Sequence, residues 1–187
     1  MNYFFKRIPS PVGELTAIAS DTGLAALLWE NENPRRVRQM SPQEDPTHPI
    51  LLETARQLNE YFSGKRSRFD LPLDFIGTDF QKKVWQALLE IPFGETRSYA
   101  QIAHQIGHPT AVRAVGAANG KNPISIIAAC HRVIGSDGKL TGFAGGLAVK
   151  ALLLRLEATH IHRETKQAPL ITDEKTGDRG NKFGYLV

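Results

Sequence analysis

The first part of the chain alternates short apolar runs with turn residues, a pattern typical of a small antiparallel sheet. The segments Tyr3–Ile8, Glu14–Ser20 and Leu24–Trp29 predict strands. They are separated by Pro9–Gly13 and Asp21–Gly23, whose proline and glycine residues favour tight turns. We therefore expect an antiparallel meander at the start of the chain.

A polar, proline-containing stretch, Asn31–Pro49, predicts a loop, and helical spacing replaces the strand pattern after it. The next apolar side chains share one face of an expected helix: Leu51, Leu52, Ala55, Leu58, Tyr61 and Phe62. Gly64 should end this helix, and Pro72–Gly77 has the composition of a linker. Because no cluster of titratable residues stands out, we interpret residues 1–75 as an α/β scaffold domain.

Helices are predicted again beyond the linker. Thr78 with Gln81, and Ser98 with Gln101, form capping boxes that open the first two. A third should follow over residues 110–118. Two short helices joined by a glycine-containing turn are typical of a helix-turn-helix.

The third of these helices is slender, because alanine and glycine fill most of it and Arg113 is its only charged residue. It is either a close-packed core helix or a thin helix that enters a DNA groove, with Arg113 reaching into the duplex. A major-groove reader presents several polar side chains to the base edges, so this composition disfavours sequence-specific reading. Sequence-independent contact through the minor groove and the backbone is compatible with it.

The only cysteine, Cys130, follows the apolar run Ile124–Ala129. This run predicts a buried, extended segment that delivers the thiol to the end of a core. A thiol there is either an inert core filler or a nucleophile, and only its thiolate attacks. His131 and Arg132 directly after it favour the nucleophile. Because neighbours on an extended chain point to opposite sides, His131 should reach Cys130 only through a water molecule.

A glycine-rich loop, Thr141–Gly146, follows, without the spacing of a phosphate-binding loop. The next helix, Leu147–Ala158, is apolar on nearly every side and should be buried. Its Glu157 then needs a partner, which a histidine beside the cysteine would supply. Residues 159–187 are polar and predict a mostly disordered extension, with docking of its last apolar residues on the body as the alternative.

Composition narrows the possible functions of this 187-residue chain. A single cysteine excludes an internal disulfide and a cysteine-rich zinc site, and it suits the reducing cytoplasm. No apolar run approaches the ~20 residues that span a membrane, and the first residues lack the order of a secretory signal. Residues 76–158 hold the basic excess, nine Lys and Arg against five Asp and Glu, which is compatible with a phosphate-bearing partner.

Three stretches together resemble a known family. They are Asn-Pro-x-x-Ile-Ile-x-x-Cys-His-Arg-Val-Ile-Gly from Asn122, Gly-Phe-Ala-Gly-Gly-Leu-Ala-Val-Lys from Gly142, and Leu-x-x-Glu ending at Glu157. The chain closely resembles the O-6-alkylguanine-DNA alkyltransferases (methylated-DNA–protein-cysteine methyltransferases), most densely over Phe80–Glu157. The resemblance implies an α+β protein with an RNase H-like N-terminal domain (1–75), a winged-helix-like catalytic domain with the helix-turn-helix (76–158) and an extension (159–187).

The resemblance also implies an activity, namely DNA repair by irreversible, stoichiometric transfer of an alkyl group from O-6-alkylguanine or O-4-alkylthymine to a cysteine. Cys130 would be the acceptor, His131 the base acting through water, and Glu157 the residue that orients His131. Asn122 would brace the segment before the cysteine, and Tyr99 would donate a proton or hydrogen bond to the leaving base. No cofactor or metal is implied, and the protein is expected to act as a monomer whose partner is damaged duplex DNA.

Further positions carried over from the family concern DNA. Arg113 would be the finger that replaces the nucleotide flipped out through the minor groove. The other expected DNA contacts are Thr110, Ala114, Ala117, Ala118 and Ser125. The base pocket would be lined by backbone groups of Cys130 and Val133, by Phe143 and by the amide of Ala144.

One residue departs from the family pattern, which has proline where this chain has Ala129. Alanine loosens φ and adds an N–H, so we expect transfer to be retained, at a rate that the lost rigidity can lower. Two alternatives to the transferase stay open. A non-catalytic lesion-binding relative is disfavoured by the presence of Cys130. A helix-turn-helix regulator is disfavoured by the non-polar surface of the third helix.

Overall fold

The computed structural model describes residues 2–31, 33 and 35–167, so the predicted extension beyond 167 lies outside the described residues. The N-terminal half (residues 2–75) contains a sheet in the order β3-β2-β1-β4 and one helix. Its elements are β1 (Tyr3–Ile8), β2 (Leu15–Ser20), β3 (Leu24–Trp29), β4 (Gln43–Glu44) and α1 (Pro49–Phe62). The predicted meander is confirmed, since β1, β2 and β3 pair antiparallel.

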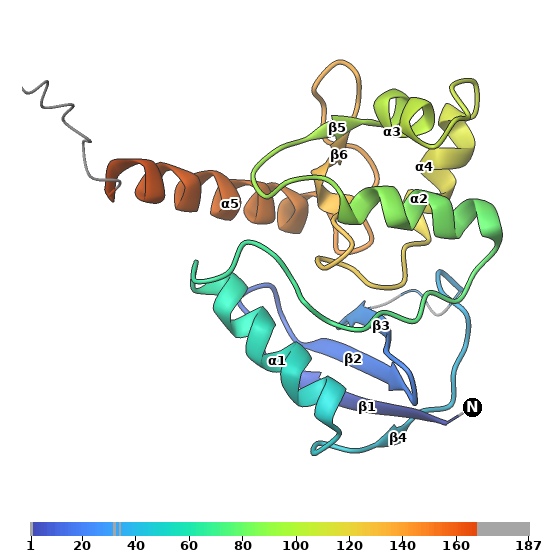
Figure 1. Cartoon of the computed structure of the whole chain (residues 1–187), viewed down its shortest axis with the longest axis vertical. Helices are drawn as coiled ribbons and strands as arrows, with labels where there is room; N and C mark the ends of the chain where they lie inside the picture. The colour runs from blue at the N-terminus through green and yellow to red at the C-terminus, as the bar shows by residue number, and fades with distance from the viewer. Residues whose placement is uncertain (1, 32, 34, 168–187) are drawn as a thin grey trace, which may run out of the picture.

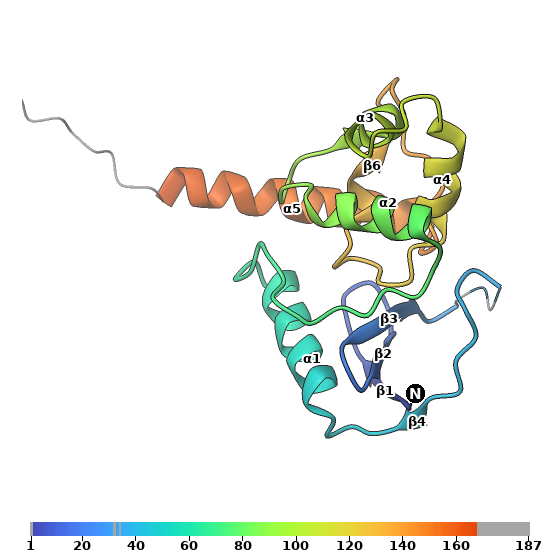
Figure 2. The ribbon, with the colours of Figure 1, turned by 45° about the vertical axis from the view of Figure 1, so that its right-hand side comes forward.

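Strand β4 was missed, because its two exposed residues lie in the stretch expected to be a loop; it pairs parallel to β1. Helix α1 lies against the sheet in Figures 1 and 2. Its buried residues recur at helical spacing and include two polar ones: Leu51, Thr54, Gln57, Leu58 and Tyr61. Leu52, which the sequence pattern placed on the inner face, is 48% exposed. The inner face of α1 is therefore rotated slightly from the expected one.

The C-terminal half (residues 76–167) is mainly helical. Its elements are α2 (Asp79–Leu89), β5 (Arg97–Ser98), α3 (Tyr99–Gln105), α4 (Val112–Gly120), η1 (Cys130–Arg132), β6 (Val133–Ile134) and α5 (Leu147–Gln167). Both capping boxes are confirmed, with Thr78 and Ser98 accepting from the backbone amides of Gln81 and Gln101. Helices α2, α3 and α4 group together above the sheet in Figure 1, and α3 and α4 form the expected helix-turn-helix.

Helix α5 differs from expectation in length and in burial. It continues to Gln167, so the first part of the expected disordered extension is helical, and in both ribbon views it projects beyond the body (Figure 2). It is not buried on every side, because Leu147 is 49% exposed. Its fully buried positions are Lys150, Leu153 and Glu157, a line of residues spaced three and four apart. The inner face of α5 thus carries two charged residues.

The two halves share a hydrophobic core. Ile124, Ile126 and Ile127 of the segment before Cys130, with Leu153 of α5, belong to the same buried cluster as the sheet and α1. The backbone joins them as well, since Leu27 of β3 donates to the Pro123 carbonyl at 2.9 Å. The edge of the N-terminal sheet therefore packs directly against the segment that leads to the cysteine.

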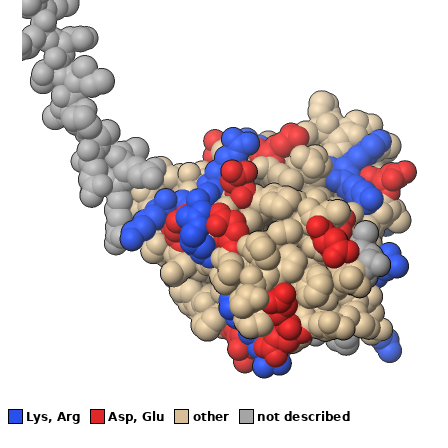
Figure 3. All heavy atoms as spheres, turned by 60° about the horizontal axis from the view of Figure 1, so that its bottom comes forward, with Lys and Arg blue, Asp and Glu red and all other residues tan. Residues whose placement is uncertain are grey.

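The surface of the N-terminal half carries charges of both signs. Figure 3 turns the lower side of Figure 1 toward the viewer and shows blue and red side chains intermingled. On α1, for example, Arg56 contacts both Glu53 and Glu60. Among the described residues, no helix is both long and apolar enough to cross a membrane.

Candidate active site

The chain approaches Cys130 through tight turns, so the expectation of an extended segment is wrong. The Ile127 amide donates to the Ser125 carbonyl at 2.8 Å, and Ile126 between them has a φ of 70°. This is the geometry of the rare classic γ-turn, and a positive φ is strained for a β-branched residue. Ile126 is completely buried, so the shared core holds it in this conformation.

A second γ-turn lies immediately before the thiol. The Cys130 amide donates to the Ala128 carbonyl at 2.7 Å, and Ala129 has φ −75° and ψ 61°, the values of an inverse γ-turn. Cys130, His131 and Arg132 then form the single 3-10 turn η1. Their side chains fan out around a helical turn instead of alternating as on a strand. The reason given for a water between Cys130 and His131 is therefore wrong.

Cys130 lies just beneath the surface, with 4% of its area exposed. Burial raises the pKa of its thiol, while a hydrogen bond from Asn122 and the positive charges of Arg36 and Lys150 act in the opposite direction. All three opposing groups favour the anionic form of the sulfur. The surroundings of the thiol thus contain the groups that a thiolate needs, although the resting thiol is protonated.

Asn122 ties the ends of the turn segment together. Its Nδ2 donates to the Ala128 carbonyl at 2.8 Å, and its Oδ1 accepts from the Ile124 amide at 3.0 Å. The Asn122 carbonyl accepts a hydrogen bond from Arg36, which belongs to the N-terminal half. The side chain therefore braces the segment on which Cys130 sits, as the resemblance implies.

His131 and Glu157 meet in the interior, as the sequence predicted. The Nε2 of His131 lies 2.6 Å from the Oε1 of Glu157, and both side chains are fully buried. Burial lowers the pKa of His131, while the hydrogen bond and charge of Glu157 oppose the shift. A neutral His131 that donates from Nε2 to a carboxylate keeps its lone pair on Nδ1. That Nδ1 is buried and has no hydrogen-bond partner among the described residues.

Glu157 is the centre of a larger network. Its Oε1 accepts from Tyr61 Oη at 2.7 Å, from His131 Nε2 at 2.6 Å and from Arg132 Nη2 at 3.0 Å. Its Oε2 accepts from Arg132 Nε at 2.9 Å and from the Gly94 amide at 3.0 Å. Burial alone would raise the pKa of Glu157, but His131 and Arg132 outweigh it and lower the pKa to about 2.

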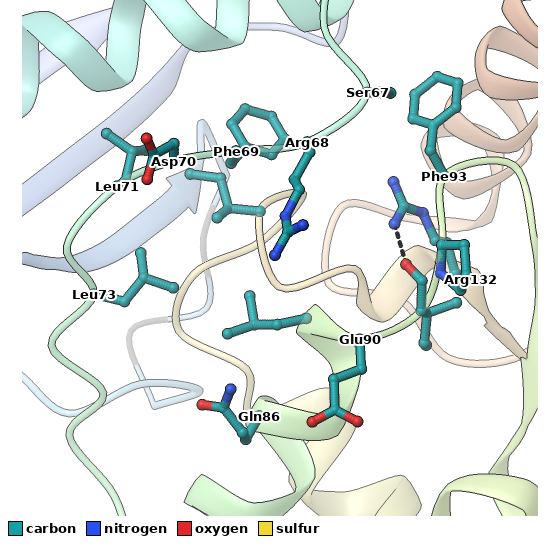
Figure 4. A pocket seen from close by; sticks show the side chains of 14 residues that line it. Ser67, Arg68, Phe69, Asp70, Leu71, Leu73, Gln86, Glu90, Phe93 and Arg132 are labelled. Atoms are coloured by element: carbon teal, nitrogen blue, oxygen red, sulfur yellow. Dashed lines mark hydrogen bonds between the residues drawn. The ribbon is translucent and has the colours of Figure 1, made fainter.

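Arg132 separates this network from a neighbouring cavity of about 660 Å³, which lies between the two halves. Its Nη1 donates to the Ile91 carbonyl at 2.6 Å, the dashed line in Figure 4, and its guanidinium lies 5.6 Å from the centre of the Phe93 ring. Arg68 points into the same cavity. Cys130, His131 and Glu157 do not line this cavity, so it is not the expected base pocket.

Tyr99 lies near the cysteine segment because β5 pairs with β6. Ser98 is in register with Ile134 in this two-stranded parallel sheet, and Tyr99 follows directly as the first residue of α3. Its hydroxyl accepts from Thr141 Oγ1 at 3.1 Å. Tyr99 is half-buried, with its hydroxyl at the loop that follows η1 and β6.

The expected DNA contacts are only partly on the surface. Thr110, Arg113, Ala114 and Ala117 are exposed at the start of α4 and along it. Ala118 and Ser125 are buried, with 3% and 0% of their areas exposed, so they do not present side-chain surface for DNA, and their contact with DNA stays a prediction. Ala118 faces α2 instead, where its carbonyl accepts from the Trp85 indole at 2.8 Å.

Two of the expected pocket residues, Val133 and Phe143, lie against Lys150, which the sequence analysis did not single out. Lys150 is fully buried and donates to the Val133 carbonyl at 2.5 Å and to the Thr141 carbonyl at 2.9 Å. Its ammonium lies 6.0 Å from the centre of the Phe143 ring. Val133 is buried, Phe143 half-buried and Ala144 exposed. Lys150 therefore fixes the glycine-rich loop next to the cysteine segment.

Sequence reasoning missed Tyr61, Lys150 and Arg36 as parts of the site, and it used Arg132 only as a basic neighbour of the cysteine. Lys150 and Glu157 lie seven positions apart on a helix and so share a face. The sequence analysis overlooked this shared face because it described the helix by its many leucines. Tyr61 gave no signal beyond its place on an apolar helix face. Among the described residues, no group of three His, Cys, Asp or Glu side chains could hold a metal ion.

Comparisons with known proteins match both halves of the chain. Residues 4–75 match the family described as 6-O-methylguanine DNA methyltransferase, ribonuclease-like domain. Residues 79–159 match the 6-O-methylguanine DNA methyltransferase, DNA binding domain. A methylated-DNA–protein-cysteine methyltransferase of Methanosarcina acetivorans is 59% identical over 156 residues, which cover 83% of this chain and 99% of the relative. One of Mycobacterium tuberculosis is 50% identical over 155 residues, 82% of this chain and 91% of the relative.

The fold matches solved structures of the same kind. The crystal structure of Mycobacterium tuberculosis OGT in complex with DNA superposes with a TM-score of 0.77 at 48% identity, over 86% of this chain and 94% of that chain. A structure described as Mycobacterium tuberculosis O6-methylguanine methyltransferase gives a TM-score of 0.76 at 48% identity, over 84% of this chain and 94% of that chain. The chain therefore belongs to the 6-O-methylguanine DNA methyltransferase family, the methylated-DNA–protein-cysteine methyltransferases of DNA repair.

Proposed function

We propose that this protein repairs DNA by moving an alkyl group, once per molecule, from O-6-alkylguanine or O-4-alkylthymine to the sulfur of Cys130. The observation that carries the proposal is the buried hydrogen bond between Glu157 of α5 and His131, the residue directly after Cys130, with the unpaired Nδ1 of His131 as a proton acceptor. A network of this kind is the arrangement that activates a nucleophile through an oriented histidine.

The chemistry begins with the thiol proton. A water bound between Sγ and Nδ1 would pass this proton to His131, and Glu157 would stabilise the resulting imidazolium. Asn122, Arg36 and Lys150 support the thiolate through a hydrogen bond and positive charge. Sγ then attacks the alkyl carbon, so that a carbon–sulfur bond forms as the bond from carbon to the base oxygen breaks.

The electron pair of the broken bond leaves on the base. Tyr99, at the end of the parallel pair β5–β6, would donate a hydrogen bond or a proton to this developing anion. The product at Cys130 is a thioether, which has no good leaving group, so each protein molecule reacts once. The chemistry calls for no cofactor.

The alkyl carbon lies inside the base stack, so the nucleotide must be turned out of the duplex before Cys130 can reach it. Arg113 is exposed on α4 and supports a role as the residue that fills the gap, with Thr110, Ala114 and Ala117 against the minor groove. Small side chains let the α4 backbone approach the groove closely. We further propose that the protein acts as a monomer in the cytoplasm.

The test is to incubate the protein with a duplex that contains one methylated guanine and to measure the mass of the protein by mass spectrometry. A mass increase of one methylene equivalent on Cys130, equal in amount to the protein, is the expected result, and a Cys130→Ser variant should stay unmodified. Unmodified protein that still binds the lesion would instead support a lesion-binding protein. Selective binding to one undamaged sequence would support a regulator.

The role of Arg113 can be tested separately from the chemistry. Arg113→Ala should slow transfer from duplex DNA by roughly ten- to a hundredfold, because the extruded state loses the group that fills its gap. Transfer from a single-stranded substrate should change far less. Lys121→Ala, which removes an exposed cation just beyond the same helix, is the matched control and should lower only the affinity for DNA. Equal losses on both substrates would remove the finger role.

A further inference from the structure

The packing around Tyr61 explains its aromatic ring but not its hydroxyl group. Tyr61 belongs to α1 in the N-terminal half, is completely buried, and packs its ring against Phe62, Phe69 and Phe93, with ring centroids 5.3, 5.4 and 6.0 Å away. A phenylalanine would fill such an aromatic site equally well. The hydroxyl must therefore be accounted for by the one hydrogen bond it makes among the described residues, which it donates to Glu157 Oε1 at 2.7 Å.

That contact joins the two halves at the group that orients His131. Oε1 accepts from Tyr61 and from His131 Nε2, at 2.7 and 2.6 Å. Within the described part of the chain, Nδ1 of the imidazole makes no hydrogen bond, so the orientation of the ring depends on the position of Glu157 Oε1. A displacement of Oε1 consequently turns the imidazole and moves Nδ1 relative to the thiol.

The number of donors around Glu157 makes Tyr61 a restraint on position. A carboxylate offers about four lone-pair sites, and five donors surround this one, from Tyr61, Gly94, His131 and twice from Arg132. Without the phenol, four donors would still satisfy the carboxylate, so the fold does not need this hydrogen bond. The carboxylate would, however, gain freedom to shift within its site.

Tyr61 acts only as a donor at any physiological pH. Burial, together with the charge of Glu157, holds the pKa of its phenol well above the usual value. The hydroxyl therefore keeps its proton while His131 gains and loses one.

We propose that Tyr61 is a positioning residue for alkyl transfer: from the N-terminal half it fixes Glu157, and through Glu157 it aims His131 at Cys130. This inference rests on the proposed function, in which His131 accepts the thiol proton. It gives the N-terminal half, interpreted from the sequence as a scaffold, a direct part in the reaction.

The test compares Tyr61→Phe with the unaltered protein at saturating duplex that carries methylated guanine. The single-turnover rate of transfer should fall on the order of tenfold, as for the loss of a hydrogen bond to a charged group. The affinity for undamaged duplex and the melting temperature should change little, because the aromatic ring remains. Tyr3→Phe, a hydroxyl deletion on β1 of the same half, is the matched control and should leave the rate unchanged.

A double-mutant cycle shows whether Tyr61 works through His131. In a His131→Ala background, adding Tyr61→Phe should slow transfer no further, since there is no imidazole left to aim. If the double variant were slower than His131→Ala by the same factor that Tyr61→Phe costs on its own, the inference would be overturned. An unaltered transfer rate in Tyr61→Phe alone would also overturn it. Nitrogen chemical shifts of the His131 imidazole give a second measurement that needs no DNA, and they should differ between the protein and Tyr61→Phe.

The outcomes separate this inference from the proposed function. If Tyr61→Phe reacts normally while His131→Ala is slow, the positioning role fails and the transferase mechanism stands. If the unaltered protein leaves Cys130 unmodified, the proposed function fails first. Unchanged imidazole shifts in Tyr61→Phe would then count against the positioning role independently.

Discussion

At the scale of single residues, the site is organised by one buried charge. A carboxylate without exposed surface is stable only when donors and a counter-charge replace water, and Glu157 has both, in five donors and in Arg132. His131 can then stay neutral at rest and become charged during the reaction without leaving an isolated charge in the interior. In the proposed mechanism this arrangement links stability to chemistry, because Glu157 would orient His131 and also neutralises Arg132.

Glu157→Gln should be strongly destabilising. It leaves the buried Arg132 guanidinium without a counter-charge, and breaking a buried ion pair on one side costs about 3–5 kcal/mol. Urea denaturation measures the loss in the free energy of unfolding. Glu53→Gln is the control, because Glu53 meets Arg56 on the exposed face of α1 and should contribute little. Similar losses in both variants would show that the network does not bear on stability.

The pH dependence of stability should report the same residue. The folded pKa of Glu157 is about 2 against an ordinary 4.5, so its contribution is complete above about 4.5 and is lost as pH falls toward 2. The shift corresponds to about 3 kcal/mol. The lowered pKa of His131 acts in the same direction, beginning below 6.5, because the unfolded chain binds that proton more readily.

Free energies of unfolding measured from pH 7 to pH 2 would check this expectation. Glu157→Gln should show a shallower decline between pH 4.5 and 2, because the lowered pKa values of other carboxyls such as Glu53 remain, and it should keep the earlier decline. Parallel profiles for the two proteins would contradict it.

The sequence revealed part of this network and could not reveal the rest. Glu157 near the end of an apolar helix required a partner, and a histidine beside the only cysteine was the available group. Arg132, two positions after the cysteine, was taken only as a group that favours a reactive thiol, since adjacency in sequence does not show where a side chain points. Tyr61 lies 96 positions from Glu157, and nothing local marks such a contact.

At the scale of elements, the two γ-turns before Cys130 decide how the thiol is presented. The apolar run was correctly predicted to be buried, but burial alone does not distinguish a strand from compact turns. The turn at Ala129 bears on the residue that departs from the family pattern. Its φ of −75° lies within the range that proline enforces, and its amide makes no hydrogen bond among the described residues.

Ala129→Pro should therefore be accepted without strain at φ. We expect a gain of about 0.4–1 kcal/mol in the free energy of unfolding, because proline lowers the conformational entropy of the unfolded chain while the folded backbone already has a suitable φ. The single-turnover rate should change by less than about twofold, since alanine already holds the inverse γ-turn. Thermal melts and rapid-quench kinetics on both proteins check this. A much faster proline variant would restore the rigidity argument made from the sequence.

The turn after α2 offers a contrasting prediction. Gly94 has a φ of 75°, and a Cβ there would meet Ile161 of α5. Gly94→Ala should cost about 1–2 kcal/mol from the left-handed backbone alone and should weaken the amide donor to Glu157. Gly120→Ala, at the end of α4 with open space around its Cβ, should instead be neutral or stabilising. Thermal melts of the two variants decide, and a stable Gly94→Ala would refute the argument.

At the scale of the whole molecule, the two halves depend on each other. Partly buried Phe75, Leu89 and Phe143 pack against both hydrophobic clusters, and β3 bonds directly to the segment before the cysteine. Strands β1, β2 and β3, the capping boxes and the helix-turn-helix followed from local patterns. The short parallel pairings, β1 with β4 and β5 with β6, did not, because two-residue strands carry no periodicity and their partners are distant in sequence.

Such a shared core should make unfolding a single transition. The chain has two tryptophans, Trp29 in β3 and Trp85 in α2, so each half carries its own fluorescent reporter. In Trp29→Phe and Trp85→Phe, the remaining tryptophan and the far-ultraviolet circular dichroism should give the same urea midpoint. Midpoints that separate within one variant would show that the halves unfold independently.

The hydrogen bond from α1 to Glu157 also restricts how such proteins can be recombined. Consider a hybrid that joins the C-terminal half of this protein to the N-terminal half of another family member. Its Glu157 would lack the hydrogen bond from Tyr61 unless the new helix also carries a tyrosine at that position. Even with a well-chosen junction in the linker, such a chimera should fold but transfer the alkyl group slowly. Grafting a tyrosine at the position equivalent to Tyr61 should be the first repair that an engineer tries.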